Sequence, residues 1–361
     1  MTRPTRAIID LAALRHNAAL ARALSPRAQL LGVIKSDGYG HGALAVARAL
    51  ATDTDAFGVA CIEEALALRT GGVRTPVLLM EGVFEPGELP IAARENFWVM
   101  VENTRQIEWI ENSHSAIPLR VWLKVDTGMS RLGFAPTVLR SVHARLTASR
   151  AVAPGIVIAT HLACADEPDS ELTQRQLSRL ALATEGIGAP LSIANSPALL
   201  AWPGARAQWN RAGYMLYGAS PFSATHPHAD DLQPVMTLES AIVSLREIAP
   251  GESVGYGATW TADRPTRLAT IPVGYADGYP RSAANGTPVL VGGHPARLVG
   301  RVSMDMLTID VSDVPAVHHG MPVRLWGEQP GVDMVARHCA TIGYELLVRV
   351  SQRVPRVYIN G

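Results

Sequence analysis

Two lysines are the residues of this sequence best suited to covalent or proton-transfer chemistry. Of the 32 basic residues, only Lys35 and Lys124 are lysine, and all the others are arginine. A general preference for arginine codons would explain such a bias. Under that bias, a lysine persists most readily where arginine cannot replace it, as in an imine formed with a carbonyl group. The residues around each lysine must therefore decide whether it is functional.

Lys35 follows an apolar run and precedes a glycine-rich loop. Residues 33–42 read VIKSDGYGHG. Partial burial at the end of a strand disfavours the charged form of an amine, and the neutral amine is the form that attacks a carbonyl group. The alternative is a surface lysine beside a glycine turn. The glycines do not follow the GxGxxG pattern, so a dinucleotide-binding loop is not supported.

A repeated pattern of strands and helices must position these residues. Short apolar runs alternate with stretches of helical period from residue 29 to about residue 218, which is typical of a parallel sheet. The runs lie at residues 30–34, 57–60, 77–80, 97–101, 119–125, 156–159, 191–194 and 215–217. These eight repeats predict a closed (β/α)8 barrel, with an open doubly wound sheet as the alternative. Active sites of such barrels lie at the carboxyl ends of the strands, where the sequence places Lys35, Lys124, Asp126, His161, Asn195 and Ser196.

The character of the chain changes after a linker rich in Pro, His and Asp at residues 223–231. Short β-branched segments separated by Gly and Pro follow, which indicates a mostly β domain. We therefore predict an α/β barrel domain over residues 1–230 and a β domain over residues 231–361. A strand expected at residues 6–10 could pair with either domain.

Composition excludes several classes of protein. Basic and acidic residues balance at 32 each, without the basic excess of nucleic-acid binders, and no apolar run is long enough to span a membrane. The first residues do not predict a signal peptide.

Cys61, Cys164 and Cys339 are widely spaced and form no CxxC pair, which fits a reducing compartment and argues against a zinc site. We expect a cytoplasmic protein with no metal, no nucleic-acid partner and no membrane partner.

The segment at residues 33–42 resembles the segment of the alanine racemase family that carries the lysine bound to pyridoxal 5'-phosphate (PLP), V-x-K-A-D-A/G-Y-G-H-G. Only Ser36 departs from that pattern. The family combines an eight-stranded α/β barrel with a following β domain, as predicted above. The resemblance implies that Lys35 attaches PLP and exchanges the α-proton on the D-alanine side. Related PLP barrels include amino-acid decarboxylases and PLP-binding proteins without catalysis, so this segment alone leaves the reaction open.

A tyrosine in the expected β domain discriminates between these reactions. Residues 254–260, VGYGATW, resemble the S-Y-G-A-T segment of alanine racemases, with Gly255 in place of serine. The resemblance implies that Tyr256 is the second catalytic base, since racemisation needs an acid–base group on each face of the substrate carbon. Decarboxylases of this fold offer a cysteine instead, and Cys339 lies in an unrelated context.

Two further segments resemble family motifs around the cofactor ring. Residues 124–133, KVDTGMSRLG, resemble K-x-D-T-G-M-x-R-L-G, which implies that Arg131 contacts the substrate carboxylate and that Lys124 is a candidate for carbamylation. Residues 211–218 resemble R-x-G-x-x-L-Y-G, which implies that Arg211 faces the pyridine nitrogen. His161 resembles the family histidine that lies between this arginine and the tyrosine base. The triplet DTG also occurs in aspartic proteases, but these need a second such triplet, which the sequence lacks.

The resemblance also implies a phosphate site and a substrate site. The phosphate site consists of Tyr39, Ser196 and the amides of Gly213 and Tyr214. Gln352 stands where the family often has a further tyrosine. Residues 300–306 and 274–281 resemble β-domain signatures, which implies that Met304 helps to hold the substrate carboxylate with Asp305 beside it in the substrate site, and that Tyr275 narrows the entrance. In the family these β-domain residues complete the active site of the neighbouring subunit.

The predicted function is that of a PLP-dependent amino-acid isomerase, an alanine racemase that interconverts L- and D-alanine by two-base proton exchange in a homodimer. It would supply D-alanine for peptidoglycan or serve alanine catabolism. A PLP-dependent decarboxylase, a non-catalytic PLP-binding protein and a racemase of broader specificity are the alternatives, and the last differs only in the size of the pocket.

Overall fold

The computed structural model describes residues 2–113 and 116–361. Its first part is a closed barrel of parallel strands, each paired with the next, in which the last strand pairs with the first. The barrel strands are β2 (Gln29–Val33), β3 (Ala56–Val59), β4 (Val77–Leu79), β5 (Phe97–Val101), β6 (Val121–Lys124), β7 (Val157–Ala159), β8 (Leu191–Ser192) and β9 (Trp209–Ala212). This confirms the predicted (β/α)8 barrel and excludes the open sheet.

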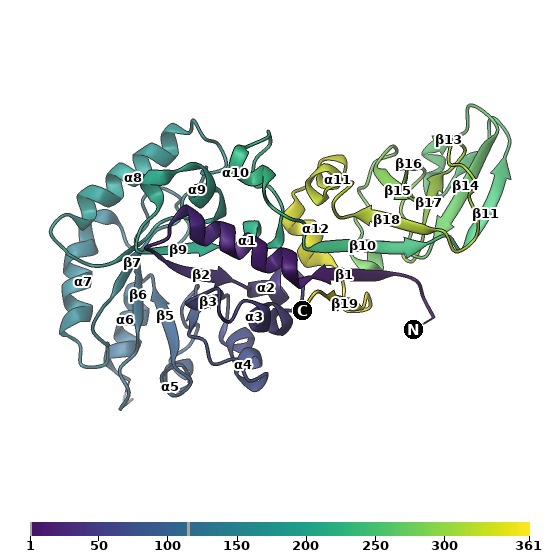
Figure 1. Ribbon diagram of the computed structural model, residues 1–361. Helices are drawn as coiled ribbons and strands as arrows, with labels where there is room; N and C mark the ends of the chain where they lie inside the picture. The colour runs from purple at the N-terminus through teal and green to yellow at the C-terminus, as the bar shows by residue number, and fades with distance from the viewer. Residues whose placement is uncertain (1, 114–115) are drawn as a thin grey trace.

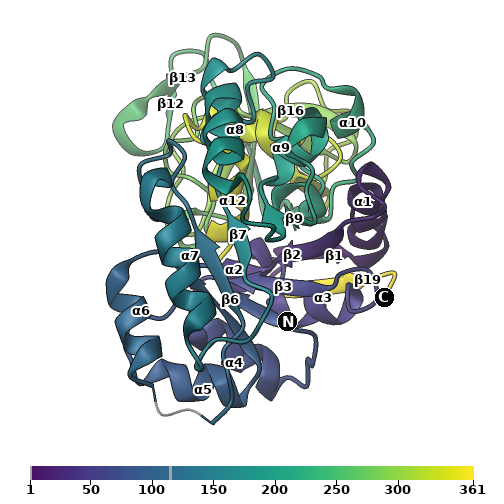
Figure 2. The same ribbon diagram turned by 90° about the vertical axis from the view of Figure 1, so that its left-hand side faces the viewer.

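Helices surround the barrel (Figure 2). They are α1 (Leu11–Leu24), α2 (Lys35–Tyr39), α3 (Ala43–Ala49), α4 (Ile62–Thr70), α5 (Glu88–Arg94), α6 (Thr104–Glu111), α7 (Leu139–Ala148), α8 (Glu171–Thr184), α9 (Ser196–Ala201) and α10 (Pro227–Asp230). The first helix shows how local sequence fixes these elements. The side chain of Asp10 accepts hydrogen bonds from the amides of Ala12 and Ala13, which caps α1 at its start.

The second part of the chain is a twisted nine-stranded sheet beside the barrel (Figure 1). Its strands are, in spatial order, β11 (Ser244–Ile248), β14 (Thr266–Ile271), β17 (Leu307–Asp310), β16 (His294–Leu298), β15 (Pro288–Val291), β18 (Pro322–Trp326), β10 (Met236–Ala241), β1 (Arg6–Asp10) and β19 (Arg356–Ile359). A small hairpin, β12 (Ser253–Val254) and β13 (Trp260–Thr261), and two helices, α11 (Val332–His338) and α12 (Gly343–Arg349), complete this part. The N-terminal strand β1 pairs with β10 and β19.

The predicted position of the last barrel strand was wrong. Residues 215–217 were expected to be a strand, but Tyr214–Tyr217 form a 3-10 helix and the strand is β9, a few residues earlier. The strand contains Asn210 and Arg211, so no apolar run marks it in the sequence. Arg211 is nevertheless buried, because carbonyl groups of neighbouring strands accept its hydrogen bonds.

Large side chains fill the interior of the barrel. Trp98, Trp122 and Trp209 pack against one another with ring centroids 5.3 to 6.3 Å apart. Smaller apolar residues of the strands, among them Leu31 and Leu78, surround these rings. The barrel is therefore a packed core rather than a channel, and space for a ligand remains at the carboxyl ends of its strands.

None of the helices within the described residues has both the length and the apolar character needed to cross a membrane.

Candidate active site

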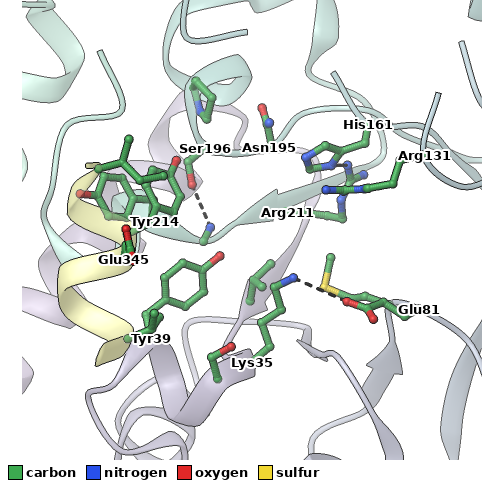
Figure 3. Close-up of a pocket in the computed structure, with 18 of the residues that line it drawn as sticks. Lys35, Tyr39, Glu81, Arg131, His161, Asn195, Ser196, Arg211, Tyr214 and Glu345 are labelled. Atoms are coloured by element: carbon green, nitrogen blue, oxygen red, sulfur yellow. Dashed lines mark hydrogen bonds and ion pairs between the residues drawn. The ribbon is translucent and has the colours of Figure 1, made fainter. Parts of the chain in front are cut away.

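A cavity of about 640 Å³ lies at the carboxyl ends of the barrel strands. Residues of the barrel form most of its wall, and α12, from the second part of the chain, forms the rest (Figure 3). Of the residues predicted to form the site, those that line this cavity are Lys35, Tyr39, Lys124, Arg131, His161, Ser196, Arg211, Gly213 and Tyr214. The structure thus brings the predicted barrel residues into one site.

A short left-handed turn holds Lys35 at the cavity. The predicted loop after β2 is α2, in which Ser36, Asp37 and Tyr39 have φ of 54°, 54° and 52°. Such angles cost L-residues about 1 kcal/mol or more each, so the surrounding contacts must stabilise the turn. The side chain of Asp37 accepts a hydrogen bond from the Ala43 amide at 2.8 Å, and the Ser36 amide donates to Glu64 at 2.7 Å. The turn therefore fixes where Lys35 and Tyr39 enter the cavity.

Tyr39 is a partly buried phenol at the wall of the cavity. Its ring stacks on Tyr217 with the centroids 4.7 Å apart. Burial raises the pKa of Tyr39 to about 12, so the phenol stays protonated at neutral pH. A protonated phenol can donate a hydrogen bond to an anion in the cavity.

Ser196 also presents a hydroxyl proton to the cavity. Its Oγ accepts hydrogen bonds from the amides of Gly213 at 2.9 Å and Met215 at 3.2 Å. A hydroxyl has two acceptor positions and one proton, so both acceptor positions of Ser196 are filled and its proton is left to donate elsewhere. Gly213 lies tightly beside Tyr39, since a Cβ at this position would come 2.9 Å from the Tyr39 hydroxyl. Because Gly213 has no side chain, the hydroxyls of Tyr39 and Ser196 can both lie close to it.

Arg211 is buried in the floor of the cavity. Its Nη1 donates to the carbonyl and hydroxyl of Ser192 at 2.9 and 2.7 Å, and its Nη2 donates to the Thr160 carbonyl at 2.7 Å. Burial lowers the pKa of Arg211 to about 10, which still leaves the guanidinium charged at neutral pH. The cavity therefore contains a fixed positive charge that can donate hydrogen bonds but accept none.

His161 is the neighbour of this arginine. Its Nδ1 lies 3.3 Å from Nη2 of Arg211. Burial, followed by the charges of Arg211 and Lys124, holds the pKa of His161 well below its usual value. The imidazole is therefore neutral at physiological pH, and Nδ1 accepts the hydrogen bond because a guanidinium can only donate.

Lys124 is the last residue of β6 and lies near Arg211 and Arg131. Burial and, to a smaller extent, the charges of Arg211 and Arg131 lower the pKa of Lys124 to about 8. The loop after Lys124 is built around Asp126, whose Oδ1 accepts hydrogen bonds from the amides of residues 128–130 at 2.9 to 3.1 Å. Asp126 thus shapes the turn that carries Arg131 back into the cavity.

The predicted residues of the second part do not reach this cavity. Tyr256 is 66% exposed, and Tyr275 and Met304 are also exposed. The amide of Tyr275 donates to the Ser303 carbonyl at 3.0 Å, which joins the segments of Tyr275 and Met304, and Asp305 accepts from Arg353 at 2.8 Å. Within one chain these residues form a surface separate from Lys35.

Glu81 and Tyr344 are among the cavity-lining residues that the sequence analysis did not identify. Glu81 directly follows the apolar run at residues 77–80, so the strand-end rule could have identified it. Tyr344 belongs to α12 and stacks on Tyr214 with ring centroids 3.6 Å apart. No local pattern marks Tyr344, because it reaches the cavity only through the fold. Gln352 is not among the cavity-lining residues.

The described residues contain no cluster of three or more His, Cys, Asp or Glu side chains that could hold a metal ion. The donors around the cavity are instead amines, guanidinium groups and hydroxyls, which suit an anionic organic ligand.

Comparison with known proteins identifies the family. Residues 9–221 match the alanine racemase N-terminal domain, and residues 235–358 match the alanine racemase C-terminal domain. The chain belongs to the alanine racemase family. It is 51% identical over 358 residues to the alanine racemase of Pseudomonas taetrolens and to the catabolic alanine racemase of Pseudomonas putida, with 99% of each chain covered.

Solved structures of alanine racemases have the same fold as this chain. The biosynthetic alanine racemase from Pseudomonas aeruginosa is 48% identical and superposes with a TM-score of 0.96, covering 99% of this chain and 100% of that chain. The alanine racemase from Acinetobacter baumannii is 38% identical with a TM-score of 0.94, covering 99% and 100%. These matches confirm the predicted family and the predicted fold, and they favour the racemase over the decarboxylase.

Proposed function

We propose that this protein interconverts L- and D-alanine with PLP as its cofactor. The observation that carries the proposal is the convergence of Lys35, Arg211, Arg131 and the hydroxyls of Tyr39 and Ser196 in one cavity of an alanine racemase fold. We assign residues 1–230 to a barrel domain and residues 231–361 to a β domain, with the strand at 6–10 added to the β domain.

The residues in the cavity fit PLP. The hydroxyl donors of Tyr39 and Ser196, which lie beside Gly213, suit a phosphate, and the volume of about 640 Å³ is typical of small-molecule sites. Lys35 would bind the aldehyde and Arg211 would face the pyridine nitrogen. When bound, PLP supplies the carbonyl group for attachment of the substrate amine and a conjugated ring that accepts electrons from Cα. Tyr344, which stacks on Tyr214, forms part of the cavity wall. Gln352 stands where the family often has a tyrosine.

Arg211 and His161 would determine whether the pyridine nitrogen of PLP carries a proton. A guanidinium gives up its proton only at high pH, and His161 is neutral, so neither group protonates this nitrogen at physiological pH. This arrangement favours return of a proton to Cα over transamination and other side reactions.

Two bases exchange the α-proton from opposite faces of the substrate. The free Lys35 amine would take or return the proton on the D-alanine side, and Tyr256 of the partner subunit would do so on the L-alanine side. Tyr256 of one chain is exposed and does not line the cavity that contains Lys35, which supports a homodimer in which each subunit completes the other's site. Tyr275, Met304 and Asp305 would enter the neighbouring cavity with Tyr256.

Arg131 would hold the substrate carboxylate. A guanidinium binds a carboxylate through two parallel hydrogen bonds, which fixes the direction of the Cα–H bond. The low pKa of Lys124 gives it a substantial neutral fraction, which is the form that reacts with carbon dioxide. A carbamate at Lys124 would turn a repulsive cation into an anion that orients Arg131.

We further propose that the protein is cytoplasmic and that it supplies D-alanine for peptidoglycan or degrades alanine. Its relatives include both a catabolic and a biosynthetic alanine racemase. Alanine is the proposed substrate, and a broader substrate range would need a wider pocket.

The Lys35→Ala variant tests the proposed attachment residue. It should lose the visible absorbance of bound PLP and all racemisation. A variant that keeps both would contradict the assignment, and release of carbon dioxide by the unaltered enzyme would favour a decarboxylase.

A further inference from the structure

Glu81 is the carboxylate that contacts Lys35. Its Oε1 lies 3.9 Å from Nζ of Lys35, and both side chains line the cavity (Figure 3). Glu81 follows β4 and Lys35 follows β2, so two strand ends of the barrel hold the pair across the cavity. In the part of the chain that the structure describes, Glu81 forms no ion pair with any other residue.

The other charged side chains around Lys35 include three cations. Lys124, Arg131 and Arg211 also line the cavity, but they are cations and cannot balance a positive charge on Lys35. The remaining titratable groups that face this region are Glu64, Glu102, Glu345, Tyr39, Tyr214, Tyr344 and His161.

Among the described residues, no carboxylate other than Glu81 forms an ion pair with Lys35. The carboxylate of Glu64 accepts from the amides of Ser36 and Ala60. Glu345 pairs with Arg349. Burial raises the pKa of Glu102, and the cations that act on its carboxylate are Lys124 and Arg131 rather than Lys35. Glu81 is therefore the carboxylate placed to balance a charge on Lys35.

We propose that Glu81 is a positioning residue for the lysine base, whose carboxylate stabilises the Lys35 ammonium after this amine has taken the α-proton of D-alanine. The proposal rests on the function proposed above. In this step the Cα–H bond breaks, its electron pair stays on the substrate, and the proton forms a new N–H bond on Lys35. Proton return to Cα reverses these changes, so Glu81 supplies charge but neither gains nor loses a proton.

The two-lysine composition makes the proposal directly measurable. Lysine labelled with an NMR-active isotope at Cε gives two side-chain signals in the full-length chain, and Lys35→Arg assigns them. In the PLP-free protein, Glu81→Gln should lower the pH midpoint of the Lys35 signal by about one unit, as expected for loss of an opposite charge about 4 Å away. Glu81→Asp, which keeps the charge, should retain most of the original midpoint.

A matched control separates this effect from a change in total charge. Glu85 lies in the same loop and makes no ion pair with Lys35, so Glu85→Gln should leave the Lys35 midpoint unchanged. An unchanged midpoint in Glu81→Gln, or an equal shift in Glu85→Gln, would overturn the proposal. This readout needs no racemisation, so it remains decisive even if the proposed activity is absent.

Kinetics of the PLP-loaded enzyme give a second readout. With D-alanine as substrate, Glu81→Gln should shift the acidic limb of the kcat profile to lower pH by about one unit. The plateau kcat should fall about threefold, because a weaker base takes the proton more slowly. The KM for alanine should stay within about twofold, since Glu81 does not bind the carboxylate. A change in KM alone, with no movement of the limb, would show that Glu81 acts on substrate binding instead.

Discussion

Replacement of Ser196 by alanine tests the phosphate site most sharply. The Ser196 hydroxyl fills both acceptor positions with the amides of Gly213 and Met215, and its proton is free for an anion. The Ser196→Ala variant removes this donor and leaves two buried amides without their acceptor. The substitution should therefore weaken both the binding of PLP and the stability of the PLP-free protein.

The contacts set the size of both effects. A hydrogen bond to a charged group contributes about 1.5 to 3 kcal/mol, which corresponds to an apparent Kd for PLP that is about 10 to 150 times weaker. The two amides lose about 1 kcal/mol each, and water in the cavity offsets part of this loss. The free energy of unfolding should thus fall by about 1 to 2 kcal/mol.

Titration of PLP-free protein with PLP measures the first effect, and urea unfolding measures the second. Ser240→Ala is the matched control, because Ser240 is buried in β10 and its hydroxyl lies 3.0 Å from Thr5 Oγ1, away from the cavity. The control should lose stability but keep its PLP affinity. An apparent Kd of Ser196→Ala within about threefold of the original would refute the assignment of Ser196.

Three further outcomes are expected. Tyr256→Phe should keep the visible absorbance of bound PLP but lose racemisation, and normal turnover would show that the second base lies elsewhere. Mixing and re-equilibrating Tyr256→Phe with Lys35→Ala subunits should restore about one quarter of the activity, since half of the dimers then contain one intact site, whereas no recovery would argue against a shared site. Burial lowers the pKa of Lys124 to about 8, whereas a lysine in the unfolded chain titrates near 10.4. Between these two pH values the unfolded chain binds more protons than the folded chain, so the free energy of unfolding should rise with pH. In urea unfolding without carbon dioxide, Lys124→Met should remove up to about 3 kcal/mol of this rise, and an identical pH dependence in both proteins would contradict the shifted pKa.

Much of the site could be predicted because parallel barrels place strand ends together. Lys35, Lys124, His161 and Ser196 lie far apart in the sequence, yet each follows an apolar run and each lines the same cavity. The repeated alternation of strand and helix was enough to predict the barrel. The family resemblance then supplied roles that periodicity cannot give.

Other features depend on tertiary contacts and could not be predicted. Strand β9 was not predicted because Arg211 interrupts its apolar pattern. Burial of Arg211 depends on acceptors that neighbouring strands supply, namely carbonyl groups and the Ser192 hydroxyl. The left-handed turn after Lys35 includes residues other than glycine, which the sequence pattern does not favour there. Tyr344 reaches the cavity because α12 folds back onto the barrel (Figure 1).

The most direct test of the proposed function is chiral analysis of alanine after the PLP-loaded protein has reacted with L-alanine in heavy water. We expect D-alanine that carries deuterium at Cα, since two-base exchange replaces the α-proton with one from solvent. L-alanine that stays unchanged and free of deuterium would contradict alanine racemisation by this protein.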